Sequence, residues 1–489
     1  MKKQFYIWHR YLGIVTCLVV FLWSVSGFLH PLMSWLQPRP VKMMLRPSAL
    51  NKADFEVSLP QALTFNQLES YQDFNIVTFD EGTYYQVRTA TDRPWRYLST
   101  RDGGELADGD RKYAIWLARQ YLQDFRSPVI EVTPVTRFDH EYKVINKLLP
   151  VYRVQFERTD RMRAYVDTAS GLLGTLNNRT KGVLMALFVN LHNWDWVGVS
   201  DRLRIALLVI FASLVVVMAI SGLLVYGLFW RTFSPLTGRA DNTRNRFKRY
   251  HRRLGLTVSV TMILWGASAA YHALEKPRIM AEAETIYAVQ EFTAADPVFP
   301  LSAILAMSAQ SPAVNISMVR LDGRAAYQVF LADRSVSYHN SVTGEILDGA
   351  NDRYIRQLAT SFSRQDPARI VSVRPITKFD DEYGFLNKRL PVVRVEYDDQ
   401  NHTRYFVEPV AGLLALELGD RKRLESYSFN YLHKWNFLNW AGKTTRDVIM
   451  LIFVCLQAIL AGSGLVMFIF WKRATGKRPQ PDRVVALRG

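Results

Sequence analysis

The sequence predicts a membrane protein with four transmembrane α-helices in two parallel repeats and with α+β domains outside the bilayer. Four stretches exceed ~18 mostly apolar residues, the usual length of a helix that crosses a bilayer. Offsetting the chain by 240–242 residues also aligns most of its motifs with a second copy, which indicates an internal duplication. The four stretches, none with a charge in its middle, are Leu12–Trp35, Ile205–Trp230, Leu254–Ala273 and Val448–Trp471.

The four spans divide the chain of 489 residues into eight segments. Each half is expected to run helix, large polar segment, helix, so the repeats would be related by a twofold axis along the membrane normal. The predicted segments are residues 1–36 (first span), 37–181 (α+β domain), 182–230 (interfacial helix and second span), 231–250 (connector), 251–276 (third span), 277–422 (second α+β domain), 423–471 (interfacial helix and fourth span) and 472–489 (basic tail).

Positive charge is concentrated at one end of the spans. The chain has a formal net charge of +17, and most of it belongs to residues 1–10, 231–253 and 472–489. These segments flank the same ends of the four spans, so the positive-inside rule places both termini and the connector in the cytoplasm and the two large segments outside. The basic charge is therefore a topology signal, and it does not indicate a nucleic-acid partner.

The first span is predicted to remain in the protein as a helix. Lys2 and Lys3 precede an apolar run, as they would in a secretory signal peptide. The run is long and rich in aromatic residues, however, and it lacks a cleavage site of small residues. Its near-copy between Tyr250 and His272 lies in mid-chain, where no signal peptide could be.

Sequence patterns in the two large segments predict α+β domains. Alternating runs predict strands at Tyr84–Ala90, Tyr152–Arg158 and Arg163–Asp167, and DGGE (residues 102–105) and VTGE (342–345) predict turns. Each segment is expected to hold two units of one helix and three strands, and neither contains a nucleophile constellation, a Gly-rich phosphate loop or a Cys/His cluster. The predicted helices are Leu59–Ser70, Arg111–Phe125, Leu301–Gln310 and Asp352–Phe362.

Six of the nine histidines are duplicated, and all six lie at predicted membrane edges. His9 and His30 are 21 residues apart, which is about 31 Å along a helix and only about 60° around it. His192 precedes the second span in an apolar stretch that predicts an interfacial helix close to His30. Their repeat mates are His251, His272 and His433, whereas His140, His339 and His402 in the polar segments have no histidine mate.

Neutral imidazoles that project from facing membrane helices suit axial ligation of haem iron. Ionisable groups in spans are costly and usually functional, and zinc or copper sites more often include cysteine, methionine or carboxylate ligands. Cys17 and Cys455 lie within spans without metal-binding spacing, so a packing role is expected for both. The predicted ligands of haem b, with at least two haems expected, are His9, His251, His30, His272, His192 and His433.

Pseudo-symmetry predicts that His9 lies opposite His251 near the cytoplasmic side. The other four histidines would lie at the external side, where they suffice for one or two haems, and the sequence leaves their pairing open. Trp23 and Trp265 are repeat mates that fall between the two levels. Packing is the role expected for these indoles, with electron transfer as the alternative.

The duplicated motifs resemble the PepSY-associated transmembrane family, which includes the FoxB-type ferri-siderophore reductases of the bacterial inner membrane. The resemblance covers nearly the whole chain, and it rests on the order and duplication of motifs that are individually weak. Those motifs are HRYLG (His9–Gly13) and HRRLG (His251–Gly255), NLHNW (Asn190–Trp194) and YLHKW (Tyr431–Trp435), SGLLVYGLFW (Ser221–Trp230) and SGLVMFIFW (Ser463–Trp471), and VDTASG (Val166–Gly171) and VEPVAG (Val407–Gly412).

The resemblance implies b-type haems and electron transfer from the cytoplasmic side, or from the quinone pool, to a ferric siderophore or other iron chelate in the periplasm. The chain has no GxGxxG motif and no flavin domain, so the electron donor would be a quinone or a separate cytoplasmic reductase. Two alternatives stay open. One is a non-enzymatic membrane anchor whose PepSY-like domains bind a partner, and the other is a metal or proton transporter that uses the histidines as a relay.

Overall fold

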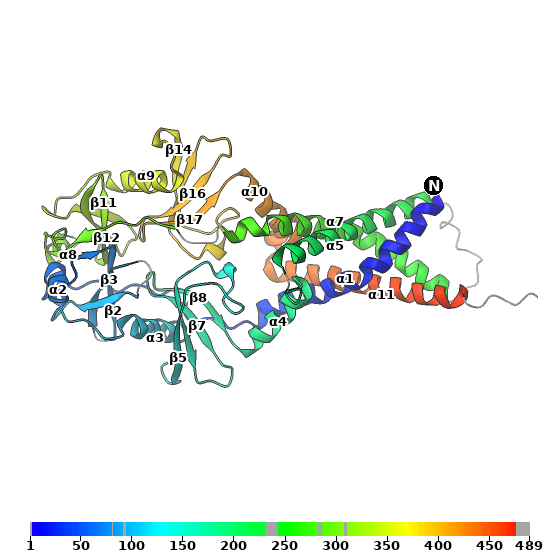
Figure 1. The fold of residues 1–489 in the computed structure, drawn as a ribbon, viewed down its shortest axis with the longest axis horizontal. Helices are drawn as coiled ribbons and strands as arrows, with labels where there is room; N and C mark the ends of the chain where they lie inside the picture. The colour runs from blue at the N-terminus through cyan, green and yellow to red at the C-terminus, as the bar shows by residue number, and fades with distance from the viewer. Residues whose placement is uncertain are drawn as a thin grey trace, which may run out of the picture. The chain divides into compact units, whose positions relative to one another are not determined.

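The computed structural model describes residues 2–475, apart from 81, 91–93, 199, 230–242, 282–285 and 308–310. The chain divides into two compact units (Figure 1). The helical unit consists of Met1–Leu36, Thr180–Ile279 and Leu424–Gly489, and the sheet unit consists of Gln37–Arg179 and Met280–Arg423. Most of the predicted connector 231–250, and the predicted tail after residue 475, lie outside the described residues.

Four long helices dominate the helical unit, and each contains a stretch that is long and apolar enough to cross a membrane. The helices are α1 (Lys2–Leu36), α5 (Asp201–Leu228), α7 (Thr243–Ala281) and α11 (Lys443–Thr475). Helices α1, α7 and α11 extend beyond both ends of the apolar runs that predicted them, and α5 begins before its run but ends at Leu228. Arginine and lysine are good helix formers and continue a helix past the apolar residues.

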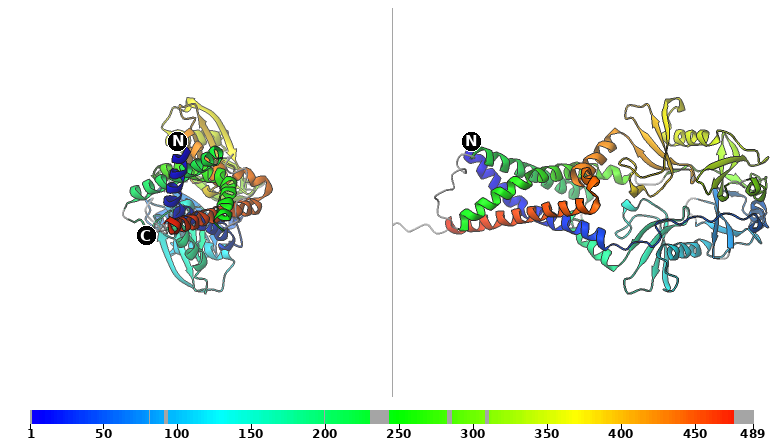
Figure 2. Two further views of the ribbon diagram at one scale, coloured as in Figure 1. Left: turned by 90° about the vertical axis from the view of Figure 1, so that its right-hand side faces the viewer. Right: turned by 180° about the vertical axis from the view of Figure 1, so that it is seen from behind.

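The long helices pack around a small apolar core in the middle of the unit. Val20 of α1, Val215 of α5, Val258 and Met262 of α7 and Leu460 of α11 are all buried there. The start of α1 and the last turns of α11 lie at the same end of the unit (Figures 1 and 2). An even number of long helices explains this arrangement, because each one reverses the direction of the one before.

Shorter helices precede α5 and α11. The predicted interfacial helix of the first half is α4 (Arg179–His192). In the second half, α10 (Asp420–Tyr427) continues into a π-helical turn, Ser428–His433, and then a 3₁₀ turn, Asn436–Ala441. A histidine is therefore the last residue of the corresponding helical segment in both halves.

Within its described residues, the sheet unit contains a small two-stranded pairing and four larger sheets, two from each half. The first half forms α2 (Leu59–Phe65), β1 (Ser70–Tyr71), β2 (Asp73–Phe79), β3 (Gly82–Arg88), β4 (Arg96–Ser99), α3 (Gly109–Leu122), β5 (Val129–Val135), β6 (Val151–Phe156), β7 (Arg163–Asp167) and β8 (Leu172–Asn177). The second half forms β9 (Ile286–Tyr287), β10 (Phe292–Thr293), α8 (Leu301–Met307), β11 (Ala313–Leu321), β12 (Arg324–Leu331), β13 (Val336–Asn340), α9 (Ala350–Ser363), β14 (Ile370–Ile376), β15 (Val392–Tyr397), β16 (Arg404–Glu408) and β17 (Leu413–Leu418).

The expectation of three strands in every unit is wrong for two of the four. The sheets β2-β3-β4 and β11-β12-β13 have three antiparallel strands, but β5-β6-β7-β8 has four and β14-β15-β16-β17 is extended further by β9. The additional strands β8 and β17 follow the turns at Gly171 and Gly412, which have φ angles of +67° and +56°. A left-handed turn of this kind returns the chain beside the strand it has just left, so a hairpin forms where the sequence predicted one strand.

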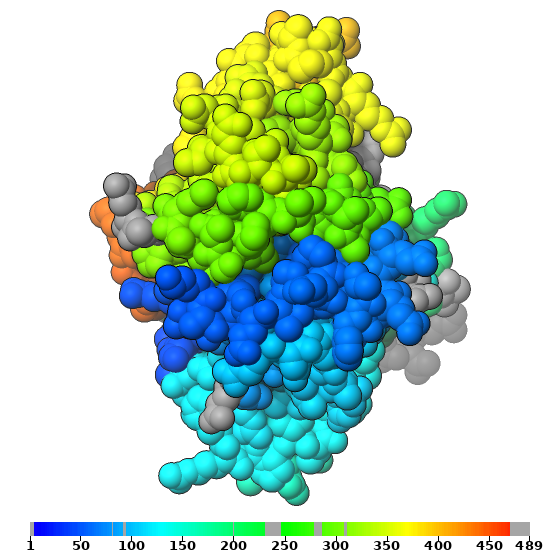
Figure 3. Space-filling model, turned by 90° about the vertical axis from the view of Figure 1, so that its left-hand side faces the viewer, coloured from blue at the N-terminus to red at the C-terminus, as the bar shows by residue number. Residues whose placement is uncertain are grey.

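The two halves of the sheet unit share one core. Ser70 and Tyr71 of β1 pair with Thr293 and Phe292 of β10, which joins the halves through the main chain. The amide of Asn315 donates a hydrogen bond to the side-chain oxygen of its repeat mate Asn75, over 3.0 Å. Figure 3 shows the face that carries α2 and α8, where the first and second halves meet along a continuous boundary.

Candidate functional site

His9 and His251 face each other in the helical unit. His9 projects from α1 and His251 from α7, and their ring centroids are 6.5 Å apart with an angle of 61° between the ring planes. Both side chains are intermediate in exposure. The structure thus brings together the two imidazoles that pseudo-symmetry placed opposite each other.

A serine hydroxyl determines which nitrogen of each ring carries the proton. Nδ1 of His9 lies 2.9 Å from the hydroxyl of Ser221 in α5, and Nδ1 of His251 lies 3.0 Å from that of Ser463 in α11. Each hydroxyl already donates its single proton to a carbonyl of its own helix, over 2.7 Å to Met218 and 2.8 Å to Leu460. The serine oxygen must therefore accept from Nδ1–H, so each neutral ring keeps a free lone pair on Nε2.

A glycine follows each of these serines and makes room for the imidazole. A Cβ atom on Gly222 would lie 2.9 Å from Cε1 of His9, and one on Gly464 would lie 3.4 Å from Cε1 of His251. The contact at Gly222 is short enough to require the ring of His9 to move, whereas the one at Gly464 is an ordinary close contact. The Ser–Gly dipeptide that the two halves share thus supplies both a hydrogen-bond acceptor for the imidazole and the space beside it.

His192 and His433 form a second pair, with ring centroids 6.4 Å apart and an interplanar angle of 77°. Nδ1 of His192 lies 2.9 Å from the hydroxyl of Ser26 in α1, and Nδ1 of His433 lies 3.1 Å from that of Ser268 in α7. These hydroxyls also donate to carbonyls of their own helices. The same argument therefore leaves Nε2 of both rings as the unprotonated nitrogen.

Burial keeps the second pair uncharged. His192 and His433 lie outside the four candidate spans, and removal from water lowers the pKa of His192 to about 4 and that of His433 to about 3. Both imidazoles are therefore neutral at pH 7, which is the form that binds a metal.

His30 and His272 lie one aromatic ring away from the second pair. Phe188 stacks on His192 with centroids 4.8 Å apart and contacts His30 at 6.1 Å. In the second half, Phe429 stacks on His433 at 4.8 Å and on His272 at 4.2 Å. The order of rings is therefore outer histidine, phenylalanine and paired histidine in each half.

The two outer histidines differ in their partners. Nδ1 of His272 is hydrogen-bonded to the carboxylate of Glu425. The repeat mate of Glu425 is Leu184, so His30 has no equivalent carboxylate. The duplicated arrangement is thus asymmetric at this position.

The geometry of both pairs fits one metal ion between two imidazoles. A metal lies about 2 Å from each bound nitrogen, and the nitrogen about 1 Å from its ring centre, which sums to a centroid separation of about 6 Å. Among the described residues, no three His, Cys, Asp or Glu side chains converge as they would around a bare metal ion. A haem needs only two protein ligands because the macrocycle supplies the others, so paired histidines suit it.

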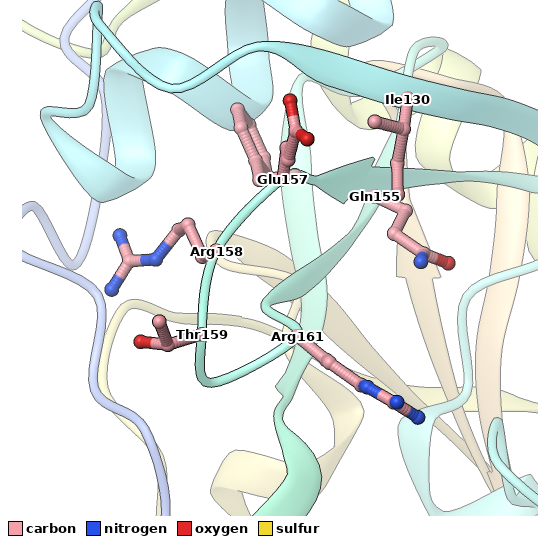
Figure 4. A pocket seen from close by; sticks show the side chains of 7 residues that line it. Ile130, Gln155, Glu157, Arg158, Thr159 and Arg161 are labelled. Atoms are coloured by element: carbon pink, nitrogen blue, oxygen red, sulfur yellow. The ribbon is translucent and has the colours of Figure 1, made fainter.

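The sheet unit offers a different kind of feature, an open hollow of about 520 Å³ between β5 and the end of β6. In Figure 4, Arg158 and Arg161 extend from this loop in different directions. Arg158 is bound to Asp124 and Asp160, which offset its charge. The residues that line the hollow are Ile130, Gln155, Phe156, Glu157, Arg158, Thr159 and Arg161. The hollow therefore lacks the converging polar groups of a built site, and the paired histidines remain the candidate site.

Sequence reasoning missed the residues that hold the imidazoles. Each of them is identical in the two halves at an offset of 241 or 242 residues, and that identity was the available signal. They are Ser26 and Ser268, Ser221 and Ser463, Gly222 and Gly464, and Phe188 and Phe429.

Comparison with known proteins identifies the family. The family model described as PepSY-associated TM region matches residues 6–337, which include α5, α7 and all but the first four residues of α1. This confirms the family part of the resemblance, whereas the reductase type stays a prediction. No curated protein matches the chain.

Proposed function

Because the chain belongs to the family of PepSY-associated transmembrane proteins, we propose that it is a haem b-containing oxidoreductase of the bacterial inner membrane. In this proposal it is of the FoxB type and passes electrons outward to a periplasmic ferric siderophore or other iron chelate. The observation that carries the proposal is the two histidine pairs, each with centroids about 6.5 Å apart and each with Nδ1–H held by serine.

The chain's own residues hold and orient two cofactors in this proposal. His9 and His251 would bind one haem iron through Nε2, and His192 and His433 the other. A bound haem iron supplies one-electron redox chemistry between its ferric and ferrous states. The serine oxygens keep the proton on Nδ1, so the ligand nitrogen is unprotonated in both pairs.

The two pairs lie at different depths along α1. His9 and Ser26, which holds the ring of His192, are 17 residues apart, so the pairs are separated by about 25 Å along the helix. The distribution of positive charge supports a cytoplasmic position for the His9–His251 pair, which places the other pair toward the periplasm. The electron donor would be a quinone or a separate reductase on the cytoplasmic side.

The proposed reaction transfers one electron to a ferric ion held by an oxygen chelator, and the product is the ferrous chelate. Ferrous iron binds hard oxygen ligands less tightly than ferric iron does, so reduction would release the iron from its chelator.

The decisive experiment is a reduced-minus-oxidised visible spectrum of the purified full-length protein. A b-type α-band is expected, together with reoxidation of the reduced protein by a ferric chelate and formation of ferrous iron trapped by a colorimetric ligand. A colourless protein would overturn the proposal and favour the membrane anchor. Metal flux through proteoliposomes without a Soret band would favour the transporter.

A further inference from the structure

Each histidine of the His192–His433 pair is held at two points by a neighbouring long helix. Nε1–H of Trp23 donates a hydrogen bond to the carbonyl oxygen of His192 over 3.2 Å, while Ser26 binds the ring of the same residue. Trp23 and Ser26 are three residues apart on α1 and so share a helix face. One face of α1 therefore binds both the main chain and the side chain of His192.

The second half repeats this arrangement with the corresponding residues. Nε1–H of Trp265 donates to the carbonyl oxygen of His433 over 3.0 Å, and Ser268 binds the ring of His433. Trp265 and Ser268 are likewise three residues apart, on α7. The occurrence of both contacts in both halves indicates that the arrangement belongs to the site and is not an accident of one helix end.

The hydrogen bond from tryptophan meets a need of the helix end. The last carbonyl groups of a helix have no partner within it. His192 is the last residue of α4, and His433 is the last residue of the π-helical turn. The indole therefore satisfies a carbonyl that its own helix leaves free and thereby fixes the position of the residue that carries it.

A second indole supports the first in each half. Trp194 stacks on Trp23 with centroids 5.6 Å apart, and Trp435 stacks on Trp265 at 5.1 Å. Trp194 and Trp435 have φ angles of +56° and +54°, a left-handed conformation that costs about 1 kcal/mol or more for such a residue. Their own Nε1 atoms are buried without a hydrogen-bond partner in the described part of the chain. They therefore contribute a ring face and no hydrogen bond to the site.

We infer that Trp23 and Trp265 are positioning residues for the His192–His433 pair. They fix the main chain of each histidine while Ser26 and Ser268 fix its ring, and together these contacts set the position and orientation of the two imidazoles. Neither indole would touch the metal. The inference rests on the proposed function, because a positioning role assumes that the two histidines bind a haem. The positions of the residues rest on the hydrogen bonds described above.

The test compares two pairs of matched variants in the full-length protein. Trp23→Phe and Trp265→Phe remove an N–H that binds a histidine carbonyl, whereas Trp194→Phe and Trp435→Phe remove an N–H that has no partner among the described residues. The readouts are the number of haems, the low-temperature EPR g-values of the ferric protein, which report the orientation of axial imidazoles, and the midpoint potential of each haem.

The first two variants are expected to shift the g-values and the midpoint potential of one haem and to leave those of the His9–His251 haem unchanged. The Trp194 and Trp435 variants are expected to keep the wild-type values. Equal shifts in both sets would overturn the inference by assigning the effect to ring stacking. Wild-type values in the Trp23 and Trp265 variants would overturn it directly.

A measurement that needs no haem separates this inference from the proposed function. Modification of histidine by diethyl pyrocarbonate can be followed residue by residue with mass spectrometry. In cofactor-free protein, Trp23→Phe is expected to speed modification of His192 several-fold, with the exposed His140 as the internal reference. An unchanged rate at His192 would overturn the positioning role, whether or not the protein binds haem.

Discussion

His9 and His251 are 242 residues apart in the sequence, and their ring centroids lie 6.5 Å apart in the helical unit. Two ligands that share one iron should be lost together. His9→Ala and His251→Ala are each expected to remove about half of the b-type absorbance of a two-haem protein. The double variant should lose no more than either single one. His140→Ala, in the sheet unit, is the control and should keep the full spectrum, and a full haem complement in both single variants would contradict the assignment of these ligands.

Ser221→Ala tests the acceptor of the His9 ring. The variant leaves Nδ1–H without its partner, at a cost of about 1–3 kcal/mol if water does not replace the hydroxyl. The imidazole also becomes a weaker electron donor when the hydrogen bond at Nδ1 is lost, so the midpoint potential of the haem it binds should rise. Ser259→Ala is the matched control, because its hydroxyl donates only to Leu256 of its own helix. Redox titration of both variants measures the midpoint potential of this haem. A higher potential in Ser221→Ala alone shows that Ser221 tunes the haem, and an unchanged potential in Ser221→Ala would contradict that role.

Gly222→Ala tests the space beside His9. The new methyl group would lie 2.9 Å from Cε1 of the ring, so the ring or α5 must move, at a cost of about 1–3 kcal/mol. Gly464→Ala should have a milder effect, since the corresponding distance to His251 is 3.4 Å. Gly462→Ala, which meets nothing within 4 Å, should be neutral or slightly stabilising. Haem content and thermal unfolding should rank the three variants in this order, and equal effects at all three positions would refute the steric explanation.

Arg389 joins the two halves of the sheet unit through charge. Its guanidinium binds Glu408 at 3.0 Å and Asp167 of the other half at 3.3 Å, and its side chain is only 4% exposed. Arg389→Leu places the residue found at its repeat mate, Leu148, but it leaves two buried carboxylates without a counter-charge. A loss of about 3–5 kcal/mol in stability at pH 8 is expected.

The stability lost in Arg389→Leu should depend on pH. Burial raises the pKa of Glu408 even beside Arg389, and removal of the guanidinium raises that pKa further. The folded variant then binds more protons than the unfolded chain above the usual carboxyl pKa, so its stability falls as pH rises. Thermal unfolding at pH 5 and pH 8 should show the smaller deficit at pH 5. A deficit that grows toward acid pH would contradict this charge argument.

Particular residues show how far the sequence alone leads. Four helices were predictable because long apolar runs have few alternatives to crossing a bilayer. The pairing of His9 with His251 followed from the duplication, since repeat mates on equivalent helices face each other across an approximate twofold axis. The extra strands β8 and β17 were missed because a hairpin depends on a left-handed turn, which local composition indicates only weakly.

The remaining pairing shows what sequence could not decide. His30 and His192 fall at the same end of the helical unit, and both have mates in the second half. The sequence pattern therefore gives no reason to prefer one of them over the other as the histidine that faces its mate. In the structure, Phe188 separates the ring of His30 from that of His192, and His192 is the residue that meets His433. Which imidazole meets its mate depends on the packing of α4 against α1, and such contacts leave no trace in hydrophobic periodicity.

The sequence by itself determined four helices that are long and apolar enough to cross a membrane, a duplicated order of elements and six duplicated histidines, because composition and period are properties of the chain alone. The tertiary structure decided which imidazoles pair, which nitrogen of each keeps its proton, and which indole holds its main chain. Those properties depend on contacts such as that between Ser221 and His9, which join residues 212 positions apart and arise only when the helices pack.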